Sequence, residues 1–155
     1  SATPLNAAVA AIETATSLDE AAGAAMHYLA GRFHYAVWFT IHEGAALGES
    51  GHGDQLTPEV IHAIAVPLGA PSIVQIAHDT RQLAIGGPPD AGPIQDRLWR
   101  TLGAPRIPMA APIELDAEIA AVIAVGDAIG DAATADDDLT RLAGTLAGAF
   151  RRIAR

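Results

Sequence analysis

Histidine is the residue type in this chain best suited to chemistry, because neutral imidazole binds transition metals and also exchanges protons near neutral pH. The chain has six histidines. His42 and His52 lie on the two arms of a predicted hairpin, where they would face each other beside Glu43 and Glu49 and form a candidate metal corner. The other histidines lack the H-x-H or i, i+4 spacing of a metal motif. We therefore expect no metal and no cofactor.

A nucleophilic site is the second kind of chemistry to weigh. The chain has no cysteine, which removes thiolate catalysis, disulfides and sulfur-rich metal sites. Ser72, His78 and Asp79 are the residue types of a hydrolytic triad. However, Ser72 lacks the G-x-S-x-G turn, and Asp79 beside His78 on a helix would not face it. We expect a protein without catalytic activity, in which Ser72 either caps a helix or offers a polar contact to a ligand.

A ligand-binding wall is the third possibility. Side chains alternate along a strand, so Trp38, Thr40 and His42 share one face of the first predicted strand. Trp99 is predicted on a short helix beside a glycine- and proline-rich loop. The alternative is that Trp38 fills the core beneath a helix, and Trp99 carries the same ambiguity. The candidate ligand-binding residues are Trp38, Thr40, His42, His52, Ser72 and Trp99.

Positioning these residues requires a sheet, and its centre is predicted at residues 106–127. This stretch reads as two apolar strands joined by a short acidic turn at 115–118. Apolar and polar residues do not alternate cleanly in it, so both faces of the sheet are expected to be covered by helices. A second hairpin pairs 35–43 with 46–53, where glycines predict a bulge or a close approach by another backbone or a ligand.

Helices are indicated by caps and by apolar spacing. Ser17 with Glu20 has the form of a capping box, Thr57 precedes a proline that suits a first helical position, and Ser72 is a further cap. The expected helices are 4–15, 17–33, 57–63, 72–80, 94–102 and one from 134 or 136 onward, with short strands near 65–68 and 83–85 and a loop over 83–93.

Composition limits the class of partner. The 155 residues suffice for one domain, 1–155, with a core of small aliphatic residues, since 50% are hydrophobic and 5% aromatic. The net charge is −9, and all nine basic residues are arginine. This balance opposes binding to nucleic acid and to anionic membranes. With no visible signal peptide and no apolar run of spanning length, we expect a cytoplasmic protein.

The terminal helices carry apolar stripes with three- and four-residue steps, the spacing of a helix-packing seam. Such a stripe either covers the domain's own sheet or forms a dimer surface, with Gly144 and Gly148 allowing close approach. We expect a homodimer through these helices. The predicted interface residues are Leu5, Val9, Ile12, Leu139, Leu142, Leu146 and Ile153.

The order of elements resembles a GAF domain over nearly the whole chain. The most characteristic pieces are SLDEAAGAAMHYLAGRF followed directly by YAVWFTIHE, the hairpin MAAPIELDAEIAAVIAVGD, and the closing TADDDLTRLAGTLAGAF. The resemblance implies an α+β fold with a central antiparallel sheet of five or six strands and helices on both faces. It also implies a single module that can be excised from a longer signalling protein.

The resemblance implies a regulatory or sensory domain that binds a small molecule or a partner signalling protein. The Asn-Lys…Phe…Asp-Glu signature of cyclic-nucleotide-binding members is absent, because the chain has no lysine and its only asparagine is Asn6. Members that hold a linear tetrapyrrole or reduce methionine sulfoxide rely on cysteine, which this chain lacks. Two alternatives stay open: an interaction module whose pocket is filled by side chains, and a haem sensor that uses histidine.

Overall fold

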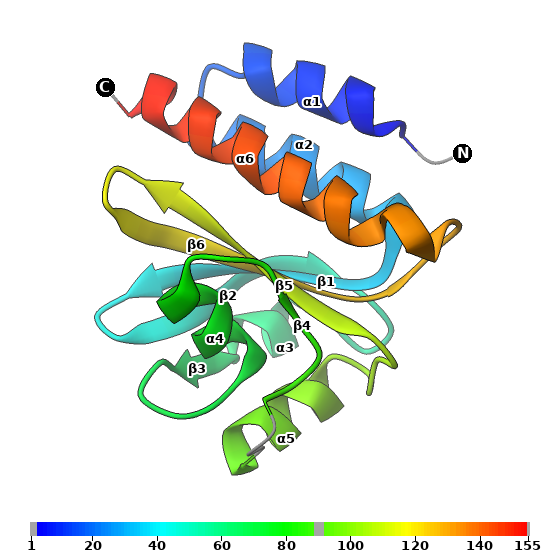
Figure 1. The fold of residues 1–155 in the computed structure, drawn as a ribbon, viewed down its shortest axis with the longest axis vertical. Helices are drawn as coiled ribbons and strands as arrows, with labels where there is room; N and C mark the ends of the chain where they lie inside the picture. Colours follow the sequence, from blue (N-terminus) through cyan, green and yellow to red (C-terminus); the bar gives the residue numbers. More distant parts are fainter. Residues whose placement is uncertain (1–2, 89–91, 155) are drawn as a thin grey trace.

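A computed structural model describes residues 3–88 and 92–154 (Figure 1). Residues 89–91 of the loop predicted at 83–93 lie outside this description. The elements in chain order are α1 (Leu5–Thr14), α2 (Leu18–Arg32), β1 (Phe33–His42), β2 (Ala45–His52), α3 (Pro58–His62), β3 (Ala65–Pro67), α4 (Ile73–Thr80), β4 (Ala84–Ile85), α5 (Pro93–Thr101), β5 (Pro108–Leu115), β6 (Glu118–Ala128), the 3₁₀ turn η1 (Ala132–Thr134) and α6 (Ala135–Ile153).

The described strands form one six-stranded sheet in the order β3-β2-β1-β6-β5-β4, and every neighbouring pair is antiparallel. The strands β1 and β6 are central, with Trp38 opposite Ile123 and Phe39 opposite Val122. All four of these side chains are buried. The hairpin predicted at 106–127 therefore does supply the middle of the sheet, which confirms why its strands are apolar on both faces.

One face of the sheet is covered by a layer of long helices, α2 and α6, with α1 packed on their outer side (Figure 1). We call α1, α2 and α6 the helix layer. Strand β1 presents Ala36 and Trp38 to this layer, and strand β6 presents Ile123 and Val125. From the other side, Leu142 of α6 joins the same buried cluster.

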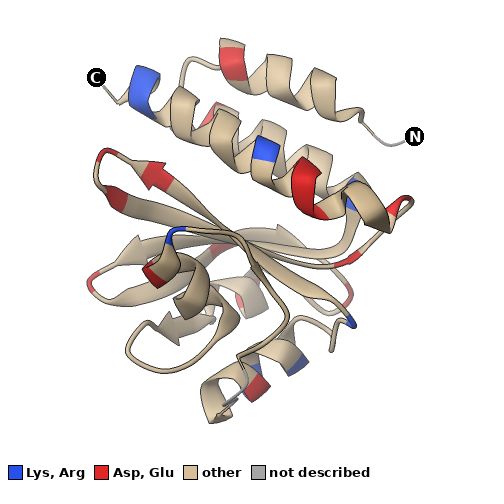
Figure 2. Cartoon of the chain, viewed as in Figure 1, with Lys and Arg blue, Asp and Glu red and all other residues tan. Residues whose placement is uncertain are grey.

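The opposite face is covered by the short helices α3, α4 and α5, which we call the short-helix face (Figure 1). Val37 and Phe39 of β1 point to this face, as strand alternation requires, and they pack in a second buried cluster with Ile73 of α4. The prediction of helices on both faces of the sheet is thus confirmed. Figure 2 shows acidic residues mainly at the hairpin tips and near the ends of helices.

Helix α3 approaches strand β2 very closely, and glycine makes this possible. The backbone N–H of Gly48 donates to the carbonyl of Ile64 at 2.9 Å. A Cβ atom at Gly48 would lie 2.1 Å from the carbonyl oxygen of Ile61, so no other residue fits without movement of the backbone. The pairing of β1 with β2 also shifts between Trp38 and Phe39, which is a β-bulge. Both consequences predicted from the glycines of this strand are present.

The predicted helix starts are confirmed by their hydrogen bonds. The hydroxyl of Ser17 accepts from the N–H of Glu20 at 3.0 Å, and the hydroxyl of Thr57 accepts from the N–H of Val60 at 3.2 Å. These caps fix where α2 and α3 begin, because each satisfies an N–H that the helix itself cannot.

Candidate functional site

The predicted ligand wall is only partly brought together. Trp38 and Thr40 do share one face of β1, and both line a groove of about 520 Å³ that opens beside the helix layer. We call this the Trp38 groove. Trp38 is only 4% exposed, and its ring centroid lies 5.9 Å from that of Phe150 on α6. It therefore fills the core beneath a helix, as the alternative for this residue held, and also forms part of the groove.

The histidine corner predicted from the first hairpin is wrong. His42 pairs with Ala45 at the hairpin turn, whereas His52 pairs with Ala36 at the far end of the same strands. His42 is exposed, and the ring Nε2 of His52 lies 2.9 Å from the carbonyl oxygen of Phe33. A long antiparallel ladder keeps its two ends apart. In the described part of the chain, no three His, Cys, Asp or Glu side chains gather closely enough to hold a metal ion.

Ser72 and Trp99 have structural roles in place of the predicted ligand contacts. Ser72 is fully buried and forms a capping box with Gln75 at the start of α4. Trp99 is 42% exposed, and its Nε1–H donates to the carbonyl of Pro105 at 3.0 Å. Neither of them lines a hollow with Trp38.

The predicted dimer residues lie mostly inside the chain. Ile12, Leu139, Leu142 and Leu146 are 0% exposed, because α1, α2 and α6 pack on one another and on the sheet. Val9 is 8% exposed. Leu5 and Ile153 are half-buried against the same core. The fully buried side chains are therefore unavailable to a second subunit, which corrects their assignment to an interface.

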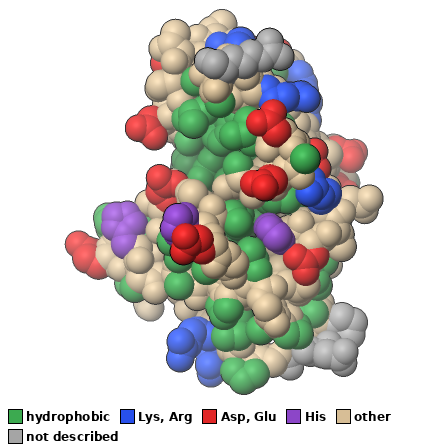
Figure 3. Space-filling view, turned by 90° about the vertical axis from the view of Figure 1, so that its left-hand side faces the viewer, with side chains coloured by type: hydrophobic (Ala, Val, Ile, Leu, Met, Phe, Trp, Pro, Cys, Tyr) green, Lys and Arg blue, Asp and Glu red, His purple; other side chains and the backbone are tan. Residues whose placement is uncertain are grey.

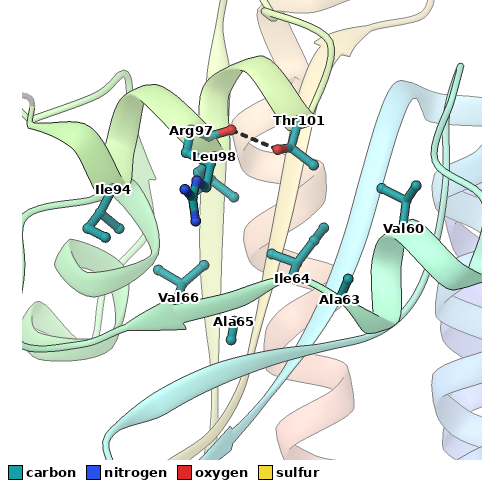
Figure 4. Close-up of a pocket in the computed structure, with 9 residues that line it drawn as sticks. All are labelled: Val60, Ala63, Ile64, Ala65, Val66, Ile94, Arg97, Leu98 and Thr101. Carbon is teal, nitrogen blue, oxygen red and sulfur yellow. Dashed lines mark hydrogen bonds between the residues drawn. The ribbon is translucent and has the colours of Figure 1, made fainter.

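A different site is formed on the short-helix face, where α5 lies over α3 and β3 (Figure 4). We call it the Arg97 hollow. Its volume is about 270 Å³, near the lower limit of roughly 300 Å³ for small-molecule sites. It is lined by Val60, Ala63, Ile64, Ala65, Val66, Ile94, Arg97, Leu98 and Thr101.

Arg97 is the one ionisable side chain in this apolar lining. In Figure 4 its guanidinium extends from α5 toward the segment that carries Ile64 and Val66. Of the described arginines, Arg32 pairs with Asp138 and Arg81 pairs with Glu114, whereas Arg97 is exposed and forms no ion pair. A guanidinium offers a planar set of donors that suits a carboxylate or phosphate.

Contacts outside the hollow hold α5 in place. The backbone N–H of Ile73 donates to the side-chain oxygen of Gln95 at 2.8 Å, and Gln95 is only 5% exposed. The bond from Trp99 to Pro105 anchors the other side of the helix. Among the lining residues themselves, the hydroxyl of Thr101 donates to the backbone carbonyl of Arg97 at 2.8 Å (Figure 4). Helix α5 is therefore held against the rest of the domain on both sides, and Arg97 extends from it into the hollow without an ion pair among the described residues.

Sequence reasoning missed the Arg97 hollow, although one signal was available. Ile94, Arg97, Leu98 and Thr101 follow the i, i+3, i+4, i+7 spacing of a single helix face. An arginine that shares a helix face with Ile94 and Leu98 is a candidate for a ligand-facing charge. The other side of the hollow comes from α3 and β3, about thirty residues earlier, and local spacing does not show which distant segment lies opposite.

Among the described residues, Tyr28 and Asp79 have a displaced pKa, and neither lines the Arg97 hollow. Burial raises the pKa of Tyr28 in the helix layer, and the nearby Asp138 carboxylate raises it further. The hydrogen bond from His78 lowers the pKa of Asp79 on α4, with a smaller contribution from Gln75. His78 Nδ1 lies 2.8 Å from the Asp79 carboxylate. This pair belongs to one helix and lies away from Ser72, so the three residues form no catalytic triad.

Comparison with solved structures identifies the fold. The GAF domain of a phosphoenolpyruvate-protein phosphotransferase from Coxiella burnetii matches with a TM-score of 0.74 at 12% identity, covering 97% of this chain and 92% of that one. The GAF domain of nlh2 from A. aeolicus, in an inactive state, matches with a TM-score of 0.66 at 15% identity, covering 96% and 93%. No protein-family model and no curated protein matches the sequence.

An enzyme has the same fold. Free methionine-R-sulfoxide reductase from Neisseria meningitidis, solved with its substrate, matches with a TM-score of 0.69 at 14% identity, covering 97% of this chain and 89% of that chain. At such identities the likeness establishes the fold alone. The chain has the GAF fold, which confirms the predicted α+β class with its antiparallel sheet. Among residues 3–88 and 92–154, every helix is too short or too polar to cross a membrane.

Proposed function

We propose that this chain is a non-catalytic regulatory domain that senses a small anion with an apolar body, bound in the Arg97 hollow. The observation that carries this proposal is the position of Arg97. Arg97 is exposed, has no ion pair among the described residues, and is the one charged side chain in the lining of an apolar hollow. A short branched carboxylate would satisfy both the charge and the apolar walls.

The proposal of a non-catalytic role has support from the residues around the hollow. Apart from Arg97, its lining side chains are aliphatic or the hydroxyl of Thr101. Arginine stays protonated at any physiological pH, so it binds charge well but transfers protons poorly. The cysteine chemistry implied for methionine sulfoxide reduction has no residue here to perform it.

The test is a titration with isovalerate, isoamyl alcohol and isoamylamine, followed by the backbone amide NMR signals. We expect the carboxylate to bind most tightly and to shift signals of α3, β3 and α5. Arg97→Gln should weaken isovalerate binding by about tenfold, the scale of a charge-assisted hydrogen bond. Arg100→Gln is the matched control, because Arg100 is exposed on the same helix and does not line the hollow. Equal binding of all three probes would contradict the proposal.

A second candidate function is an interaction module that dimerises through the terminal helices. Gly144 and Gly148 support it, since a Cβ at either position would meet nothing within 4 Å. They lie beside Glu13 and Arg152 in a shallow groove between α1 and α6. We propose that a homodimer uses this outer surface of the helix layer, in place of the buried stripe.

Sedimentation velocity tests this dimer. Gly144→Arg fills the open surface and should shift the protein from dimer to monomer. Ala117→Arg is the control, because it adds the same charge at the exposed tip of the β5–β6 hairpin. A wild-type chain that stays monomeric at high micromolar concentration would refute the dimer and leave the ligand proposal standing.

A further inference from the structure

The Trp38 groove lies at the end of the helix layer where the first turns of α2 and the last turns of α6 overhang the sheet. It is lined from α2, β1, β2, β5, β6 and α6, and its volume of about 520 Å³ is within the range of ligand sites. Figure 3 looks at the side where both hairpin tips project, and it shows apolar side chains gathered in a hollow below the helix layer, with acidic side chains around it.

The walls of the groove are apolar and partly aromatic. Leu18 is 39% exposed at the start of α2, and Met26 and Leu115 are half-buried beside the groove. Trp38 and Phe150 line it where the helix layer meets the sheet. Such a surface gains free energy when an apolar molecule covers it, roughly 25 cal/mol for each Å² removed from water.

The charged groups of the groove are all of one sign. Asp19 and Glu49 are its ionisable lining residues, and both are carboxylates. In the described part of the chain neither of them takes part in an ion pair. The hydroxyl of Thr40 donates to the carboxylate of Glu49, which holds that carboxylate next to Trp38 and Thr40.

The β-bulge explains why Glu49 reaches this place. Trp38 pairs with Ser50 and Phe39 pairs with Gly48, so Glu49 is the extra residue between them. A bulge redirects the side chain of its extra residue. Helix α3 holds the same bulge from the opposite face of the sheet, where the ring Nε2 of His62 lies 3.0 Å from the carbonyl oxygen of Glu49. The carboxylate is therefore positioned by contacts to its backbone and its side chain.

From this geometry we propose that the Trp38 groove is a second binding site, which takes a small organic cation with an apolar body, such as an aryl-alkyl amine. The apolar part would cover Leu18, Met26 and Leu115, and the ammonium would lie between the carboxylates of Asp19 and Glu49. Aromatic rings in the wall attract a cation through their quadrupole. An anion would meet two carboxylates and no basic group in this lining. A bare metal ion would find too few oxygen ligands among apolar walls.

The test uses three probes of similar shape: phenethylamine, phenethyl alcohol and hydrocinnamate. Amide NMR signals and the indole signal of Trp38 report binding at the groove, apart from signals of the Arg97 hollow. We expect phenethylamine to bind most tightly and hydrocinnamate least. Glu49→Gln keeps the shape of the side chain and should weaken amine binding by about fivefold, the upper range for an exposed ion pair, while binding of the alcohol stays unchanged.

Asp19→Asn and Asp137→Asn form a matched pair of variants. Both aspartates are exposed in the first turn of a helix and both favour the helix dipole, but only Asp19 lines the groove. Asp19→Asn should weaken amine binding, and Asp137→Asn should not. The proposal is overturned if phenethylamine fails to bind up to its solubility limit, if the alcohol binds as tightly as the amine, or if both aspartate variants have the same effect.

Discussion

The two faces of the sheet are covered by helices of different length. Each face has a hollow, and the charged side chains that line the two hollows are of opposite sign. The helix layer has helices of 10, 15 and 19 residues. The short-helix face has helices of 5, 8 and 9 residues. The hollow beside the helix layer is lined by carboxylates, whereas the hollow under α5 contains a single arginine. One sheet thus carries two surfaces with opposite electrostatic preference.

Helix length accounts for the different extent to which the two faces are buried. A helix of five turns places several apolar residues over the sheet at once, so Leu139, Leu142 and Leu146 of α6 are all fully buried. A helix of five residues places few, and on α3 Ile61 is buried while Val60 is 38% exposed at the edge of the Arg97 hollow. The long helices therefore contribute stability along their whole length, and the short ones leave room at their edges.

The largest effect is expected when a fully buried side chain of the helix layer is shortened. Leu142→Ala removes a fully buried side chain and should lower the free energy of unfolding by about 3 kcal/mol, whereas Val60→Ala should change it by less than about 0.5 kcal/mol. Urea denaturation at two protein concentrations measures both. Equal losses would show that the Arg97 hollow is packed as tightly as the core, and a loss that depends on concentration would place Leu142 in a subunit interface.

Two glycines test the difference between the two faces, because replacing each with alanine should change the stability of the protein in opposite directions. Gly48→Ala forces the carbonyl of Ile61 away from β2 and should destabilise the protein by about 2 kcal/mol. Gly144→Ala places a Cβ on α6 where no atom of the same chain lies within 4 Å, and it should stabilise the folded monomer by about 0.5–1 kcal/mol through helix propensity. Thermal unfolding followed by circular dichroism reports both shifts. A stabilising Gly48→Ala would refute the close contact between α3 and β2.

The sequence predicted the elements better than their contacts. The hairpin at 106–127 was recognisable because its strands are apolar on both faces, and the helix starts at Ser17 and Thr57 because caps are local chemistry. The stripe on α6 was equally recognisable, but three- and four-residue spacing describes a helix packed on its own sheet as well as one packed on a second subunit. Only the position of α1 and α2 decides which side chains are covered.

The candidate sites depend on segments that are distant in the sequence, and prediction succeeded only in part. Trp38 and Thr40 were placed correctly on one strand face by alternation. His42 and His52 were paired wrongly, because two arms of a hairpin bring residues together only at matching register positions. Glu49 was considered only beside the candidate metal corner and was not placed with Trp38 and Thr40, since the position of the bulge depends on how α3 packs against β2.

Trp99→Phe tests how firmly the short-helix face is held. The substitution removes the N–H that donates to the buried Pro105 carbonyl and should cost about 1 kcal/mol. Because the lost bond anchors α5 alone, amide hydrogen exchange should quicken in α5 and stay unchanged in α6. An equal increase in the exchange rate of both helices would mean that the two faces of the sheet unfold as one unit, which would contradict this prediction.

The smallest effect concerns Asp79 on the short-helix face. Hydrogen bonds from His78 and, secondarily, Gln75 lower the pKa of this carboxyl below its ordinary value of 3.8, so the folded protein binds its proton less readily than the unfolded chain does. The resulting stability is present above pH 3.8 and is lost as the pH falls through the lowered pKa. Asp79→Asn should cost less than about 1 kcal/mol near neutral pH, because the carboxylate is half-exposed. In urea titrations, the difference in free energy of unfolding between Asp79→Asn and the wild type should become smaller as the pH falls below 3.8. Asp54→Asn is the control, since that exposed carboxylate accepts no hydrogen bond among the described residues. If the difference in free energy of unfolding between Asp79→Asn and the wild type stayed constant with pH, the hydrogen bonds from His78 and Gln75 would not be stabilising the charged form of Asp79.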